Sequence, residues 1–142
     1  MKQLLLFFSV IGLSFMDPYS HLKAKYITNT LPLALSLELN YEVPLELTLA
    51  QSALESAWGQ SYNAKYRCNY FGITDANGYY RVFDSKEESF HYYGKLLSNR
   101  YSDCLTLDHR ESIECIHAKG YAKDENYADK LMKLFRQVRR MV

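Results

Sequence analysis

The chain has 142 residues, of which 48% are hydrophobic and 23% are charged, and its formal net charge is +1. This length fits one domain that can bury a sizeable apolar core. The near-neutral net charge argues against a dedicated nucleic-acid binder, which would carry a strongly basic face.

An apolar run occupies residues 4–15, shortly after Lys2. The run is too short for a comfortable membrane span but fits the apolar core of a signal peptide. No small-x-small cleavage site precedes Asp17, so a removed signal peptide, an uncleaved anchor and a first helix packed on the domain all stay open. We expect export, with residues 1–18 as signal peptide or N-terminal anchor and residues 19–142 as a domain of the periplasm or cell envelope.

Two helices are expected in the first half of the chain. Thr30 is a candidate cap for the first helix, with Pro32 near its first turn. Pro44 fits the start of the second helix. The apolar positions that recur at helical spacing are Leu33, Leu37, Leu47, Ala50 and Leu54.

A turn region follows the second predicted helix. Gly59 and the polar stretch 61–69 end that helix. Residues 70–74 and 79–83 are β-prone, and Asp75-Ala76-Asn77-Gly78 separates them. This pattern predicts a β-hairpin.

Three further helices complete the predicted fold. Ser85 followed by Glu88 is a capping box that opens the first of them. A short helix around residues 113–116 ends near Gly120, a residue suited to a helix C-terminus. The last helix is expected over residues 127–138, and arginines in its final turns suit its C-terminus. The sequence therefore predicts a mainly α domain with one short β-hairpin, which follows the helix of Glu55 and so could form one wall of a cleft.

The chain has three cysteines, Cys68, Cys104 and Cys115. An odd count leaves at least one thiol unpaired within an exported chain. Cys104 and Cys115 are the pair closest in sequence, but free buried thiols are equally compatible with the sequence. No Cys/His spacing resembles a zinc site, and we expect neither a metal nor a cofactor.

Glu55 is the residue best suited to carry chemistry. It lies near the end of the second predicted helix, with Gln51 one turn before it and Trp58 nearly one turn after it. An indole and an apolar wall would desolvate the carboxyl and raise its pKa. A protonated Glu at neutral pH can donate its proton to the departing oxygen of a glycosidic bond. On composition alone, a solvated Glu at a helix end is the commoner arrangement.

The 13 tyrosines of the chain fit the same interpretation. Amphipathic rings stack on the apolar faces of sugars, and their hydroxyls form hydrogen bonds. Any single Tyr is nevertheless more often an ordinary core or half-buried residue.

Four stretches of the sequence together resemble one family. Residues 49–61, LAQSALESAWGQS, resemble the catalytic helix of the glucosaminidase family of bacterial peptidoglycan hydrolases, which includes the muramidase-like domain of the flagellar rod-cap protein and the listerial autolysins. Residues 69–73, 83–101 and 120–131 resemble three further motifs of that family in the same order. The resemblance spans about residues 25–138, and four ordered motifs are more specific than one.

The resemblance implies a lysozyme-like α fold and cleavage of the β-1,4 bond after N-acetylglucosamine in the wall glycan. The family's catalytic Glu falls on Glu55, and a Tyr important in its active site falls on Tyr121. Asn69 and Phe71 match positions that shape the groove, and Tyr127 matches a second motif tyrosine, although each of these can also be structural. The expected substrate-binding residues are Gln51, Trp58, Asn69, Phe71 and Tyr127.

The sequence leaves the second catalytic group open. Many family members carry a second carboxylate on a longer hairpin, whereas residues 73–81 contain no Glu and only one carboxylate, Asp75. Glu88 is explained by capping, and Glu87 is no better a candidate. We therefore expect Asp75 as the second catalytic residue, with the acetamide of the substrate as the alternative.

Three functions stay open at this point. The first is an endo-β-N-acetylglucosaminidase, and the second is a lytic transglycosylase that needs only Glu55. The third is a non-catalytic wall-binding component of a secretion or conjugation apparatus. The expected partners are peptidoglycan strands and a larger envelope-spanning apparatus, with no nucleic acid and with membrane contact only through an N-terminal anchor.

Overall fold

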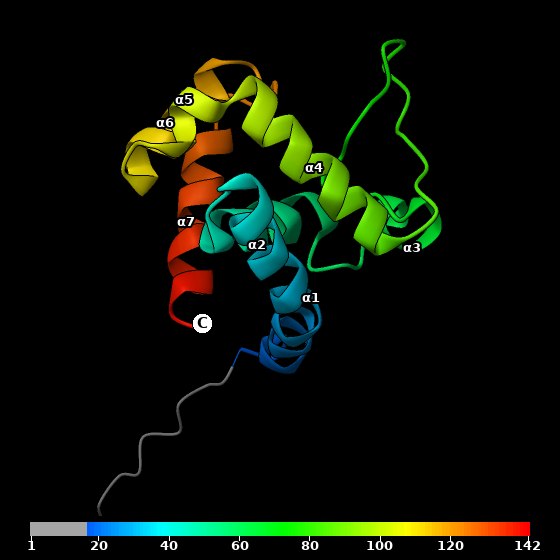
Figure 1. The fold of residues 1–142 in the computed structure, drawn as a ribbon. Coiled ribbons are helices and arrows are strands. Elements are labelled where there is room, and N and C mark those ends of the chain that lie inside the picture. The colour runs from blue at the N-terminus through cyan, green and yellow to red at the C-terminus, as the bar shows by residue number, and fades with distance from the viewer. Residues whose placement is uncertain (1–16) are drawn as a thin grey trace, which may run out of the picture.

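The computed structural model describes residues 17–142, and the predicted signal peptide or anchor falls almost entirely outside this part. The described chain folds into seven helices (Figure 1). Within this part, no helix is both long and apolar enough to cross a membrane. The helices are α1 (Ser20–Tyr41), α2 (Leu45–Ser56), α3 (Tyr62–Arg67), α4 (Lys86–Arg100), α5 (Ser102–Leu105), α6 (His109–Ala118) and α7 (Tyr127–Arg139).

Helix α2 is the centre of the fold. Most of its residues are buried, including Thr48, Gln51 and Ser52, which is the property of a core helix rather than of a surface helix with one apolar stripe. It packs against α7 and α1, and α1 also packs against α4. The helix that carries Glu55 is therefore held by neighbours on several sides.

Helix α1 begins well before the predicted start at Thr30. The Thr30 side chain does not cap a helix: it is buried within α1, and its hydroxyl donates to the Tyr26 carbonyl at 2.7 Å. Pro32 lies inside the helix, although an interior Pro removes a backbone hydrogen bond. Packing of Tyr26 and Ile27 in the core extends the helix upstream, so the prediction of a start at Thr30 was wrong.

The predicted β-hairpin is not formed as two strands. Among residues 17–142, a single antiparallel bridge joins Thr74 and Tyr80. Residues 74–80 are all exposed, so no sheet or helix covers either face. An isolated two-stranded ribbon has little to stabilise it, and the segment is a long loop that projects from the helices (Figure 1).

The remaining predicted helices are confirmed. Ser85 accepts from the Glu88 amide at 3.0 Å and opens α4, and Gly120 adopts a left-handed backbone with φ +87° after α6. The sequence prediction missed α5 and also α3, which Ser61 caps by accepting from the Ala64 amide. A Ser before a short polar run was the available signal for α3.

Two of the three cysteines form a disulfide. Cys104 in α5 and Cys115 in α6 are joined, with their Cα atoms 5.5 Å apart, and Cys68 is free. The bond ties α5 to α6 at the end of the molecule where α4 finishes (Figure 1).

Candidate active site

Glu55 lies in the last turn of α2, and the way this helix ends determines what surrounds the carboxyl. The helix stops at Ser56, after which Ala57, Trp58 and Gly59 all have positive φ. The Ser56 hydroxyl accepts from the Gly59 amide at 2.8 Å and so fixes this turn. The prediction that Trp58 follows Glu55 on the same helical face was therefore wrong.

Trp58 instead packs toward α1. Its ring makes an edge contact with Tyr26, with centroids 5.9 Å apart, and the Lys23 ammonium lies 5.5 Å from its centroid. The indole is thus part of a different wall of the molecule from the one that faces the Glu55 carboxylate.

Gly72 is the backbone neighbour of Glu55. Its φ is +64°, and a Cβ added to it would stand 3.1 Å from Glu55 Oε2. Asn69 holds the turn: its amide side chain donates to the Ile73 carbonyl at 2.8 Å and accepts from the Ile73 amide at 3.0 Å. A Gly at this position therefore allows main chain to approach the carboxyl closely.

Burial raises the pKa of Glu55 to about 7, and the neighbouring Tyr127 hydroxyl opposes part of that rise. The charged form is disfavoured because a partly desolvated carboxylate loses water without gaining a cation. A substantial fraction of Glu55 is consequently protonated at neutral pH, as a general acid requires.

A chain of buried hydrogen bonds from two other helices ends at Tyr127, which acts on the pKa of this carboxyl. Tyr93 of α4 donates to Gln51 Oε1, and Gln51 Nε2 donates to the Tyr127 hydroxyl of α7 at 2.9 Å. Because the Tyr127 oxygen accepts from Gln51, its own proton is available to Glu55. The chain therefore orients the Tyr127 hydroxyl toward the carboxyl.

Tyr121 completes the aromatic surroundings. Its ring stacks on Tyr127, with centroids 5.7 Å apart, and makes an edge contact with Tyr101 at 5.9 Å. Its hydroxyl donates to the Phe71 carbonyl at 3.5 Å. Burial and, to a lesser degree, the neighbouring Tyr127, Tyr93 and Glu55 raise the pKa of Tyr121 well above its ordinary value, so its hydroxyl stays protonated.

A pocket of about 230 Å³ opens beside Gly72 and Tyr121. Gly72 lines this pocket and also lies against Glu55 Oε2, which makes the pocket the candidate site for the scissile bond. Its lining consists of the turn after Asn69, one face of α4 and the segment before α7: Phe71, Gly72, Ile73, Thr74, Tyr92, Leu96, Arg100, Tyr101, Gly120 and Tyr121.

Three residues predicted to bind substrate are buried, and of these only Phe71 lines the pocket. Gln51 and Asn69 are fully buried, and both make the internal hydrogen bonds described above. Phe71 is also buried, and its ring stacks on Tyr93 with centroids 3.8 Å apart. The structure thus brings all three to the site as its supports.

Asp75 lies in the projecting loop. Its Oδ1 accepts from the Asn77 and Tyr79 amides at 2.9 and 3.0 Å, so the carboxylate stabilises its own turn. The pKa of Glu55 responds to burial and to Tyr127 rather than to this carboxylate.

The sequence interpretation missed Gly72 and Tyr93 as functional residues. Gly72 lies within residues 69–73, one of the four family-like motifs, and a Gly in a turn motif was the available signal for a left-handed backbone. Tyr93 was not singled out from the sequence, although a buried Tyr hydroxyl generally requires a partner.

One cluster among residues 17–142 has the composition of a metal site, Asp103 with Cys104 and Cys115. The two sulfur atoms are joined in a disulfide and are not thiolate ligands. The cluster therefore does not hold a metal in this oxidised state.

Comparison with known families gives one match over most of the chain. The glucosaminidase family model, described as mannosyl-glycoprotein endo-beta-N-acetylglucosaminidase, matches residues 31–140. No curated protein sequence matches the chain.

Several solved structures share the fold. A peptidoglycan hydrolase from Sphingomonas sp. A1 has a TM-score of 0.72 at 26% identity, covering 83% of this chain and 92% of that one. The glycoside hydrolase domain of FlgJ from Salmonella typhimurium has a TM-score of 0.67 at 27% identity, covering 84% and 89%. The catalytic domain of the autolysin Auto from Listeria monocytogenes, at 22% identity and a TM-score of 0.70, covers 84% and 86% and is similar in fold.

Proposed function

The chain belongs to the glucosaminidase family of glycoside hydrolases, and we propose that it cleaves the β-1,4 bond after N-acetylglucosamine in peptidoglycan. The observation that carries this proposal is a half-buried Glu55 whose pKa is raised to about 7 beside a tyrosine-lined pocket. Peptidoglycan as the substrate is supported by the similarity to the Sphingomonas sp. A1 peptidoglycan hydrolase.

Glu55 acts first as the general acid. Its proton passes to the glycosidic oxygen as the bond to the sugar C1 breaks, and the departing chain leaves as an alcohol. The carboxylate left behind then takes a proton from the attacking water, which restores the starting state.

The positive charge that develops on the sugar needs a partner. The two candidates are the Asp75 carboxylate and the carbonyl oxygen of the substrate acetamide, which can attack C1 and be displaced by water. The hydrogen bonds of Asp75 to its own turn favour the acetamide.

The tyrosines position the reacting groups. Tyr121 borders the pocket, and we assign it to orienting the sugar or the water. Tyr127 directs its hydroxyl at Glu55, and Gln51 and Tyr93 are positioning residues that fix this direction. Asn69 and Phe71 hold the turn and ring that support the pocket wall.

The proposed location is the periplasm or cell envelope, where the substrate lies. The Cys104–Cys115 disulfide supports it, since such bonds persist mainly in oxidising compartments. Service to a larger envelope-spanning apparatus remains a prediction.

The test is the chemistry of the products released from purified peptidoglycan. We expect soluble fragments with reducing N-acetylglucosamine ends, identified by mass spectrometry after borohydride reduction. The reaction mixture is compared with a protein-free control and with the Asp75→Asn variant, which should retain activity if the acetamide is the nucleophile.

A lytic transglycosylase is the second candidate, because Glu55 has no second carboxylate among the causes of its pKa shift. Fragments with anhydro ends would establish that reaction and exclude hydrolysis. Binding to the wall without any soluble fragments would indicate a non-catalytic component.

A further inference from the structure

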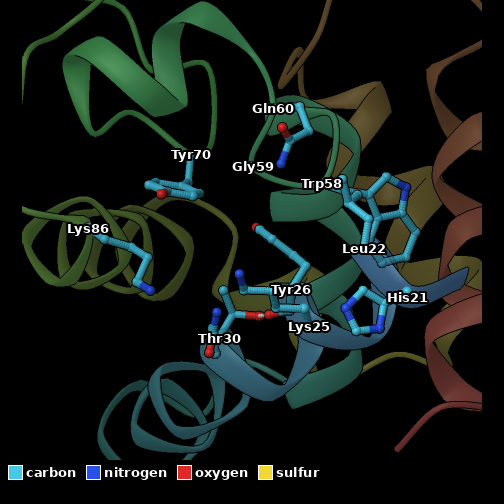
Figure 2. A pocket seen from close by; sticks show the side chains of 11 residues that line it. His21, Leu22, Lys25, Tyr26, Thr30, Trp58, Gly59, Gln60, Tyr70 and Lys86 are labelled. Atoms are coloured by element: carbon cyan, nitrogen blue, oxygen red, sulfur yellow. Dashed lines mark hydrogen bonds between the residues drawn. The ribbon is translucent and has the colours of Figure 1, made fainter. Parts of the chain in front are cut away.

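A second cavity, of about 380 Å³, lies between α1, the turn after α2 and the start of α4 (Figure 2). Tyr26 forms its back between Trp58 and Tyr70, with ring centroids 5.9 and 6.5 Å from theirs. The volume is of the size that holds a small ligand.

This cavity is separate from the catalytic pocket. The two share no lining residue. Tyr70 lines the cavity, whereas Phe71 and Gly72 line the pocket, so the segment that carries them forms a wall between the two sites. Gly59 keeps the cavity open, because a Cβ there would stand 3.2 Å from the Tyr26 ring.

The cavity is cationic. Lys25, Lys86 and His21 line it, together with the amide side chains of Asn29 and Gln60, and no carboxylate does. Within residues 17–142, neither lysine is in an ion pair, whereas the adjacent Lys23 is paired with Asp17 at 2.5 Å. Two uncompensated ammonium groups beside aromatic walls favour an organic anion.

We propose that this cavity binds a carboxylate of the peptide stems of peptidoglycan. The carboxylate lies between Lys25 and Lys86, the stem amides bond to Asn29 and Gln60, and the aliphatic parts contact Trp58 and Tyr70. The choice of peptide rests on the proposed function, whereas the preference for an organic anion rests on the cavity itself. A stem held here adds affinity for the polymer without taking part in bond cleavage.

Trp58 makes the proposal directly measurable. It is the only Trp of the chain and lines the cavity, so its fluorescence reports on occupancy. The probe is N-acetylmuramyl-L-alanyl-D-isoglutamine, which carries one free carboxylate and no glycosidic bond for the enzyme to cut. Binding is therefore read independently of hydrolysis.

We expect a saturable change in Trp58 fluorescence that weakens as salt is added. The Lys25→Gln/Lys86→Gln variant should bind the probe at least about tenfold more weakly. The control is Lys65→Gln/Lys95→Gln, which removes the same charge from exposed positions outside the cavity and should bind as the wild type does.

Besides the absence of probe binding, three results would overturn the proposal. They are equal binding by Lys25→Gln/Lys86→Gln and the wild type, an equal response to uncharged N-acetylglucosamine trimer, and an equal response to inorganic phosphate. If the wild-type chain binds the probe but releases no wall fragments, the proposed hydrolysis fails and the anion site stands. If the wild-type chain releases wall fragments without binding the probe, the anion site fails and the proposed hydrolysis stands.

Discussion

At the scale of single residues, the pKa of Glu55 couples chemistry to stability. Burial raises it from 4.5 to about 7, because the folded protein prefers the neutral carboxyl. Below pH 4.5 the group is protonated in both the folded and the unfolded chain. As the pH rises toward 7 the unfolded chain releases this proton first, so stability is lost over that range.

The Glu55→Gln variant, which cannot ionise, should therefore gain stability relative to the wild type as the pH rises. We expect the difference in free energy of unfolding to grow by about 3 kcal/mol between pH 4 and pH 8. Urea unfolding at several pH values measures it. A difference that does not change with pH would show that Glu55 is solvated.

Gly72 offers a second test beside the same carboxyl. A Gly72→Ala side chain would press on Glu55 Oε2 at 3.1 Å, whereas Gly78→Ala, at φ +84°, would meet nothing within 4 Å. Both variants incur the left-handed backbone cost of about 1 kcal/mol. Only Gly72→Ala should lower kcat, by about tenfold or more, in assays of wall-fragment release. Equal kcat for the two variants would remove Gly72 from the site.

The sequence identified candidate site residues where they belong to a motif, but it did not predict which polar side chains are buried. Glu55, which lies against Gly72, and Tyr121, which lines the pocket with Gly72, come together in the structure, and their catalytic roles stay predictions. Gln51 was expected to face substrate, yet it lies fully buried between two tyrosines. A polar residue in a helix gives no local sign that partners distant in sequence will enclose it.

At the scale of elements, three helices meet through the hydrogen bonds from Tyr93 to Gln51 and from Gln51 to Tyr127. Helix α2 supplies both Gln51 and Glu55, and α4 and α7 supply the tyrosines. The geometry of the acid thus depends on how these helices pack.

Tyr93→Phe should disturb that geometry from a distance. It leaves the buried Gln51 oxygen without its donor, which costs about 1–3 kcal/mol of stability. The freed Gln51 amide no longer fixes the Tyr127 hydroxyl. Because that hydroxyl lowers the pKa of Glu55 in the wild type, its loss should raise the pKa. The alkaline limb of the kcat/KM profile should therefore move to higher pH.

The control for this variant is Tyr66→Phe, at an exposed ring on α3, which should change neither stability nor the pH profile. A Tyr93→Phe protein that is less stable but has an unchanged alkaline limb would leave Tyr93 with only a structural role.

Local patterns predicted most elements but not their limits. Capping signals placed α4 and α6 correctly, because caps depend on a few adjacent residues. Thr30 and Pro32 resembled a helix start, whereas contacts of Tyr26 and Ile27 in the core extend α1 upstream. The signal read as a hairpin marks only a turn, because residues 74–80 are exposed and nothing else in residues 17–142 packs on them to stabilise strands.

At the scale of the whole molecule, the disulfide is a covalent link between the consecutive helices α5 and α6. It joins residues 11 apart in sequence, and closing a loop of this size stabilises a domain by about 3 kcal/mol in the chain-entropy description. The Cys104→Ser/Cys115→Ser variant should unfold at a correspondingly lower temperature and should not respond to reductant. Cys68→Ser, at the free thiol, should still respond, and equal melting of all three proteins would contradict a stabilising role.

The predicted family and the mainly α, lysozyme-like domain are confirmed, since four ordered motifs fix the arrangement of helices. The cationic cavity could not be predicted, because α1, Trp58, Tyr70 and Lys86 come together only in the folded chain.

The central claim is that Glu55 donates the proton. Its most direct test is the release of reducing ends from purified peptidoglycan by the wild type, Glu55→Gln and Glu46→Gln, which makes the same change near the start of the same helix. We expect Glu55→Gln to be slower by about two to four orders of magnitude while remaining folded, and Glu46→Gln to be unaffected. Full activity in folded Glu55→Gln would contradict the claim.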